Sequence, residues 1–121
     1  MKGKVLVVDD SAMARRQLRR MLEGAGLEVA EAEDGIVALE RYFLDKPHVV
    51  LLDLVMKGMY GLDVISKLRQ IDPEVRVVVV TADIQQPSRD LAAQQGARGF
   101  INKPVDEREL LDTLRPLLGA A

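Results

Sequence analysis

Short apolar runs that end at a polar residue recur along the chain and predict the buried strands of a parallel sheet. Runs of four apolar residues precede Asp9, Asp53 and Thr81, and a shorter run ends two residues before Lys103. Runs of this length, bounded by polar residues, are typical of strands that are buried on both faces. A stretch of alternating apolar and acidic residues adds a strand with one less buried face. The predicted strands are 4–8, 27–32, 49–52, 75–80 and 99–102.

Between these runs, apolar residues recur every three or four positions, which is the spacing of one face of a helix. Ser11 precedes the first such segment and is a predicted N-cap. In the second segment the predicted inner stripe consists of Ile36, Leu39 and Phe43. The predicted helices are 12–23, 35–44, 62–70, 87–95 and 106–117.

Five strands that alternate with five helices predict a doubly wound α/β fold, a three-layer sandwich with a parallel sheet and right-handed crossovers. The chain of 121 residues is expected to form a single domain, with its core at about 4–118 and no output domain. In such sheets ligands lie outside the carboxyl ends of the strands. The polar residues that end the predicted strands are therefore the candidate site.

Composition narrows the class of partner. The formal net charge is −2 and 30% of the residues are charged, so no overall field favours nucleic acid or a membrane surface. No apolar run approaches the roughly 20 residues of a membrane helix. The chain has no cysteine, which excludes disulfides and thiolate metal sites. We expect a cytoplasmic protein.

The predicted strand ends deliver three carboxylates, one hydroxyl and one ammonium to a single edge: Asp9, Asp10, Asp53, Thr81 and Lys103. Clustered carboxylates repel one another unless a cation neutralises them. Carboxylate oxygens without imidazole or thiolate favour Mg²⁺. The alternative is that Asp9 or Asp10 only caps the first helix.

The same residues suggest phosphoryl chemistry. Asp53 is the candidate nucleophile, because a carboxylate can form an aspartyl phosphate. Lys103 could pair with a phosphoryl oxygen, although a lysine after a strand is more often a solvated surface charge. Thr81 could donate its hydroxyl to a phosphoryl oxygen, although threonine ends many strands.

Five motifs occur in a fixed order: VLVVDDS at 5–11, EDGIVALE at 33–40, LLDLVM at 51–56, VVVVTA at 77–82 and INKPV at 101–105. On these motifs the chain resembles the receiver domain of bacterial two-component response regulators, from Lys4 to about Leu118. The resemblance implies a flavodoxin-like fold with strand order 2-1-3-4-5. It also implies a stand-alone, chemotaxis-regulator-like protein that takes a phosphoryl group onto Asp53 from a histidine kinase or a histidine phosphotransfer protein.

The resemblance assigns a role to each site residue. It implies that Mg²⁺ is held by Asp10, Asp53 and the backbone carbonyl of Val55, with Asp9 acting through metal-bound water. Lys103 would contact the phosphoryl group.

Further roles implied by the resemblance concern switching. The Lys103–Pro104 peptide bond is expected to be cis, and Thr81 is expected to act as a switch residue together with Phe100. Because Phe100 has no hydroxyl, it could switch only by a change in burial. The output surface would be the face of the fourth helix, fifth strand and fifth helix, where a downstream protein target binds, and a phosphatase is a further expected partner.

Some positions depart from the family pattern or vary within it. Lys57 stands where receivers commonly have proline, which predicts a more mobile loop at 54–61. Val55 and Asp83 occupy variable positions that would tune the access of water to an aspartyl phosphate. Four arginines on the first helix form either a solvated face or a docking face for the phosphodonor: Arg15, Arg16, Arg19 and Arg20.

Several alternative functions stay open at this point. The chain could be a phosphorelay intermediate, a small phosphatase with an aspartate nucleophile, or an FMN-type binding module. It could also be a scaffold that is never phosphorylated. The phosphatase would need a substrate cap, and the FMN module would need a phosphate-binding loop where Asp9 and Asp10 would repel the phosphate.

Overall fold

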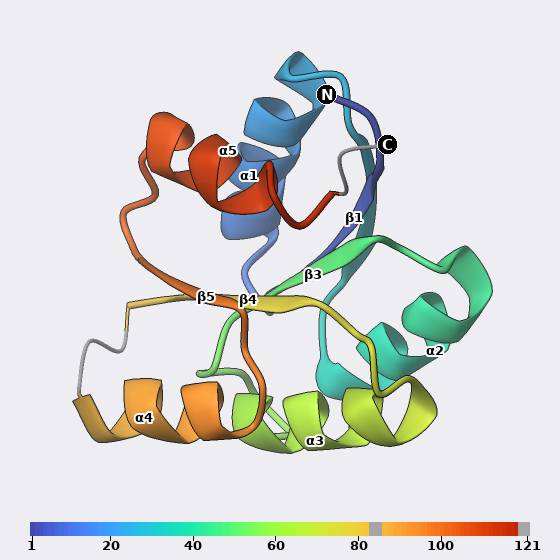
Figure 1. The fold of residues 1–121 in the computed structure, drawn as a ribbon, viewed down its shortest axis with the longest axis vertical. Helices are drawn as coiled ribbons and strands as arrows, with labels where there is room; N and C mark the ends of the chain where they lie inside the picture. Colours follow the sequence, from blue (N-terminus) through green and yellow to red (C-terminus); the bar gives the residue numbers. More distant parts are fainter. Residues whose placement is uncertain (83–85, 119–121) are drawn as a thin grey trace.

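The computed structural model describes residues 1–82 and 86–118 and is drawn in Figure 1. Strands and helices alternate along the chain as predicted. The strands are β1 (Lys4–Val8), β2 (Glu28–Ala32), β3 (Val49–Leu52), β4 (Val77–Thr81) and β5 (Gly99–Asn102). The helices are α1 (Ala12–Gly24), α2 (Gly35–Asp45), α3 (Gly61–Ile71), α4 (Gln86–Gln94) and α5 (Glu107–Leu114).

All five strands run parallel in the order β2-β1-β3-β4-β5. The order places β1 beside β3, so that Val8 pairs with Leu52 although the two residues are far apart in the sequence. The residues that follow these two strands therefore emerge side by side. The predicted fold class and strand order are both confirmed.

Two helical layers cover the sheet, which explains why its central strands are apolar on both faces. One face packs under α1 and α5, and the other packs against α2, α3 and α4 (Figure 1). Within β1, Val5 and Val7 face the first layer, while Leu6 and Val8 face the second. None of the helices in the described part of the chain is both long and apolar enough to cross a membrane.

Most element ends lie within one residue of the prediction, and two differ by more for local reasons. β4 begins at Val77, two residues later than predicted, because the Val75 N–H donates to the Asp72 carbonyl in a turn (3.0 Å). α5 ends at Leu114, three residues earlier than predicted, just before Pro116. Proline has no N–H to continue the helical hydrogen bonds.

The predicted inner stripe of α2 is wrong by one position. Ile36 and Phe43 are each 69% exposed, and the third member of that stripe is only partly buried. Gly35, Ala38 and Tyr42 are buried instead. A Cβ on Gly35 would lie 2.8 Å from a side-chain carbon of α3, so this face of α2 makes the close approach. Small residues and an amphipathic tyrosine line the contact, and their hydropathy is lower than that of isoleucine and phenylalanine.

Candidate functional site

Sheet hydrogen bonds continue past the strand ends and fix the backbone of the candidate residues. The Asp53 N–H donates to the carbonyl of Val8 (3.0 Å), and the Lys103 N–H donates to the carbonyl of Thr81 (2.9 Å). The Asp9 N–H donates to the last residue of β2 (3.1 Å). Each candidate side chain thus starts from a strand end that is held in the sheet.

Lys103 joins two buried carboxylates. Its Nζ lies 2.7 Å from Oδ2 of Asp9 and 2.9 Å from Oδ2 of Asp53, whose side chains are 2% and 9% exposed. Burial alone would lower the pKa of Lys103, but hydrogen bonds to the two carboxylates and their charges outweigh it and raise the pKa above 10.5. The ammonium therefore stays charged and offsets most of the repulsion between Asp9 and Asp53.

Both oxygens of Asp53 are engaged by donors. Oδ1 accepts the hydroxyl of Thr81 (2.8 Å) and the N–H of Val55 (3.0 Å), while Oδ2 accepts Lys103. Thr81 is fully buried. Asp53 is 7% exposed and is held in one orientation as an anion that faces a hydroxyl and an ammonium. Such an arrangement suits a nucleophile whose charge must be balanced before and after attack.

Asp10 does not join this cluster. It is exposed, and its Oδ2 accepts the N–H of Lys57 (3.1 Å). Within the described ranges no three acidic or histidine side chains converge closely enough to hold a metal ion. Of the three predicted carboxylates, the structure brings Asp9 and Asp53 together through Lys103 and leaves Asp10 apart.

The donor atoms at this edge nevertheless fit Mg²⁺. They are carboxylate oxygens, without imidazole or sulfur, and Mg²⁺ binds through one or two carboxylates while it keeps several waters. Asp10 and Asp53 would supply that number. Mg²⁺ can therefore bind here without three carboxylates that converge in advance.

Arg15 is an anchor of the site that sequence reasoning missed. Its Nη1 donates to the backbone carbonyl of Asp9 (2.6 Å), and its Nε donates to Glu31 on β2 (3.0 Å). Arg19 also pairs with Glu31 (2.6 Å). The predicted arginine cluster therefore divides, because these two side chains are tied to β2 while the other two are exposed. A fixed role for Arg15 could have been suspected from its place one turn after Asp10.

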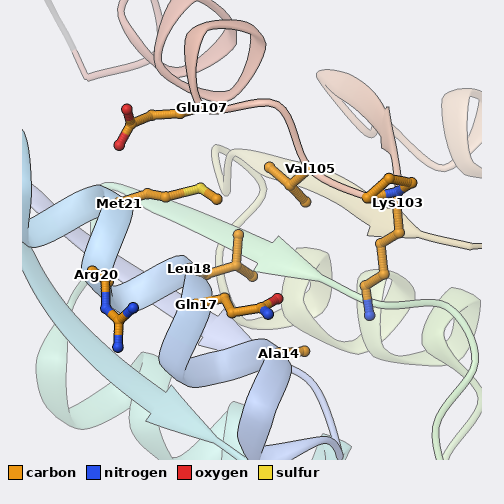
Figure 2. A pocket seen from close by; sticks show the side chains of 9 residues that line it. Ala14, Gln17, Leu18, Arg20, Met21, Lys103, Val105 and Glu107 are labelled. Carbon is orange, nitrogen blue, oxygen red and sulfur yellow. The ribbon is translucent and has the colours of Figure 1, made fainter.

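A pocket of about 480 Å³ flanks Lys103 on the side of α1. Figure 2 shows Ala14, Gln17 and Met21 of α1 opposite Val105, in the segment that leads to α5, and Glu107, the first residue of α5. Its lining is completed by Leu18, Arg20, Lys103 and Pro104. The pocket gives Lys103 a concave, partly apolar neighbourhood rather than an open surface.

The remaining predictions concern the Lys103–Pro104 peptide bond, Phe100 and Asp83. The Lys103–Pro104 peptide bond is cis. Phe100 is partly buried on β5, and the guanidinium carbon of Arg89 lies 4.9 Å from the centre of its ring. Asp83 lies outside the described residues.

The family model of the response regulator receiver domain matches residues 5–115. The chain belongs to the response regulator receiver domain family. Chemotaxis protein CheY of Thermotoga maritima is 38% identical to this receiver domain, over 94% of the chain and 96% of that protein. Protein PilH of Pseudomonas aeruginosa is 40% identical, over 96% of the chain and 98% of that protein.

Solved structures agree with this assignment. A CheX–CheY–BeF3–Mg²⁺ complex from Borrelia burgdorferi matches the receiver domain with a TM-score of 0.90 and 28% identity, over 96% of this chain and 89% of that chain. Proteins of this family are typically signalling proteins rather than enzymes.

Proposed function

We propose that this receiver domain accepts a phosphoryl group on Asp53 from a phosphohistidine of a histidine kinase or a histidine phosphotransfer protein. The observation that carries the proposal is the buried carboxylate of Asp53, held between the hydroxyl of Thr81 and the ammonium of Lys103. Membership of the receiver family supports it. The pocket beside Lys103 supplies a concave surface next to the site for such a donor.

The transfer forms a bond between phosphorus and a carboxylate oxygen of Asp53 and breaks the phosphorus–nitrogen bond of the donor. Catalysis of such a step depends mainly on positioning and on stabilising charge. Lys103 and Thr81 donate to different oxygens of Asp53, which supports the proposal that both would donate to an incoming phosphoryl group.

Mg²⁺ belongs to the proposal. Asp10, Asp53 and the backbone carbonyl of Val55 would hold the ion, with Asp9 acting through its waters. When bound, it would neutralise charge on the phosphoryl oxygens. The all-oxygen donor set supports this assignment, as does the Mg²⁺ in the B. burgdorferi complex.

The proposed output surface is the face formed by α4, β5 and α5, where a downstream protein would bind. Thr81 would turn its hydroxyl to the phosphoryl group, and Phe100 would then move inward. The contact between Thr81 and Asp53 supports the first step, and the partly buried ring of Phe100 supports the second. A phosphatase would end the signal, and the pairing of CheY with CheX in the B. burgdorferi complex shows that such a domain binds a second protein.

The test is labelling with Mg²⁺ and acetyl phosphate, followed by intact mass measurement and peptide mapping. We expect one acid-stable, base-labile phosphoryl group on Asp53, and none after chelation of Mg²⁺ or in Asp53→Asn. Asp63→Asn, which changes an exposed carboxylate in the first turn of α3, is the matched control and should label normally. Equal labelling of Asp53→Asn would refute the proposal.

A further inference from the structure

The backbone N–H of Lys57 ties the segment between β3 and α3 to the carboxylate of Asp10. The N–H donates to Oδ2 at 3.1 Å, across 47 positions of the chain. Among the described residues this is the one side-chain hydrogen bond that the structure gives the Asp10 carboxylate. Asp9 and Asp53 share Lys103 instead. Asp10 is thus restrained by a peptide group and not by the ammonium that organises its neighbours.

The same segment holds a second carboxylate two residues earlier. The N–H of Val55 donates to Oδ1 of Asp53 at 3.0 Å, so alternate peptide groups of this segment bind Asp53 and Asp10. Movement of either carboxylate would therefore break or shift a hydrogen bond of the backbone that leads to α3. Lys57 contributes to this restraint through its peptide group, whatever its side chain does.

With this hydrogen bond in place, no three acidic or histidine side chains of the described residues converge closely enough to hold a metal ion. We propose that the Lys57 N–H is a positioning group that holds Asp10 away from Asp53, so that Mg²⁺ must displace this hydrogen bond to recruit Asp10. The inference rests on the proposed function, in which Asp10 is a ligand of Mg²⁺. Beyond that function, the inference states that the hydrogen bond from Lys57 lowers the affinity for Mg²⁺. It also states that Mg²⁺ binding releases the Lys57 N–H from Asp10.

Replacing Lys57 by proline removes the donor, and it also restricts the backbone of Met56. Lys46 is the one residue other than glycine with positive φ among the described residues, so Lys57 lies in the half of φ space that proline occupies. Lys57→Ala is the matched control, because it removes the same side chain and charge but keeps the N–H. The comparison of the two variants removes the contribution of the Lys57 side chain, and the wild-type readout below separates loss of the hydrogen bond from the stiffer backbone of proline.

The experiment is a titration of unphosphorylated protein with Mg²⁺, followed by amide chemical shifts of Asp9, Asp10 and Asp53. Because this hydrogen bond is exposed to solvent, we expect the net contribution of an ordinary hydrogen bond, which changes the affinity by about three- to tenfold. We expect Lys57→Pro to bind Mg²⁺ more tightly than Lys57→Ala by that factor. Equal or weaker binding by Lys57→Pro would overturn the inference.

The wild-type chain gives a second readout that does not depend on whether the proline variant folds. The Lys57 amide proton should move upfield and exchange faster with solvent when Mg²⁺ saturates the site, while the Val55 amide stays bonded to Asp53. A Lys57 amide that stays protected at saturation would contradict displacement. If Asp53 were not labelled by a phosphodonor, the proposed function would be refuted, but both Mg²⁺ readouts could still be measured. If the protein did not bind Mg²⁺ at all, this inference itself would be overturned.

Discussion

Removal of the ammonium between Asp9 and Asp53 should destabilise the metal-free domain substantially. The perturbation is Lys103→Met, which keeps the length of the side chain and removes its charge. Two carboxylates that are 2% and 9% exposed would then face each other without a counter-ion. Loss of one partner from a buried ion pair typically costs about 3–5 kcal/mol.

Two features of the structure lower this expected loss of stability. The Lys103 side chain is 24% exposed, so solvent screens part of the interaction. Asp9 also keeps the N–H of Ser11 at 2.9 Å, and Asp53 keeps the hydroxyl of Thr81. We therefore expect a loss of about 2–3 kcal/mol in the free energy of unfolding. For a chain of this size the melting temperature should fall by about 6–15 °C.

The assay is urea and thermal unfolding followed by far-UV circular dichroism in the presence of a chelator. Lys67→Met, which removes an exposed charge from α3, is the control and should change stability by less than about 0.5 kcal/mol. Added Mg²⁺ should stabilise Lys103→Met more than the wild type, because the ion would replace the missing charge. Unchanged or increased stability of Lys103→Met without Mg²⁺ would refute the reasoning.

The pH dependence of this difference has a definite sign. The pKa of Lys103 is raised in the folded chain, so its stabilisation is fully present below the ordinary value of 10.5. It is lost as the pH rises through the raised value of the folded state. The gap in stability between wild type and Lys103→Met should accordingly be constant near neutral pH and narrow above pH 10.5, as Lys103 loses its proton.

Three further predictions concern packing, a polar contact and switching. Gly61→Ala should lower the free energy of unfolding by about 3 kcal/mol, because the new Cβ would lie 2.5 Å from a backbone Cα. Gly24→Ala has nothing within 4 Å of the new Cβ and should be neutral or stabilise the domain by up to about 1 kcal/mol. Thermal unfolding of both variants checks these values. Tyr42→Phe should lose about 0.5–1.5 kcal/mol, since the hydroxyl donates to Asp72 at 2.6 Å. That hydrogen bond lowers the pKa of Asp72 in the folded state. The difference in stability between wild type and Tyr42→Phe, measured by urea unfolding, should therefore vanish as the pH falls through this lowered pKa. Thr81→Ala should keep most phosphoryl labelling but lose the amide shift changes that labelling produces over α4, β5 and α5; equal shifts in both proteins would exclude this relay.

The strands could be predicted from the sequence because a central parallel strand has a simple requirement. Both faces of β1, β3 and β4 are covered by helices, so every residue must be apolar until the strand ends at a polar one. Asp9, Asp53 and Thr81 mark those ends, and the same pattern therefore located the candidate site. Strand order came from the family resemblance, since apolar runs carry no information about which strands are neighbours.

The face of α2 could not be predicted because hydropathy does not measure fit. The inner positions are Gly35, Ala38 and Tyr42, which allow close approach to α3 and let a hydroxyl reach a polar partner. Ile36 and Phe43 are more hydrophobic but are exposed. At the contact between α2 and α3, the fit of the side chains therefore decides which face of α2 is buried, rather than their hydropathy.

The contacts of Asp10 were hidden for a different reason. The donor that holds Asp10 is a peptide N–H, which every residue except proline possesses. A sequence pattern identifies carboxylates and ammonium groups, but it does not show which backbone groups face them. The replacement of proline by Lys57 was visible in the sequence, yet it suggested only a more mobile loop, whereas the structure joins the Lys57 N–H to Asp10.

The proposed switch at Phe100 combines two opposing energies. Full burial of a phenylalanine is worth about 1.5–3 kcal/mol. The contact with Arg89, at 4.9 Å from the ring centre, favours the observed position by about 0.5–1 kcal/mol if inward movement breaks it. Because Phe100 is already partly buried, the net gain on moving inward is then at most about 0.5–2.5 kcal/mol, well below the roughly 5.5 kcal/mol needed to shift a two-state equilibrium from 1:99 to 99:1. In the proposed switch, the space for the ring opens only when Thr81 turns to the phosphoryl group, so phosphorylation would supply the rest of the bias. The unphosphorylated domain should then sample the inward position of Phe100 in a minor but detectable fraction of molecules.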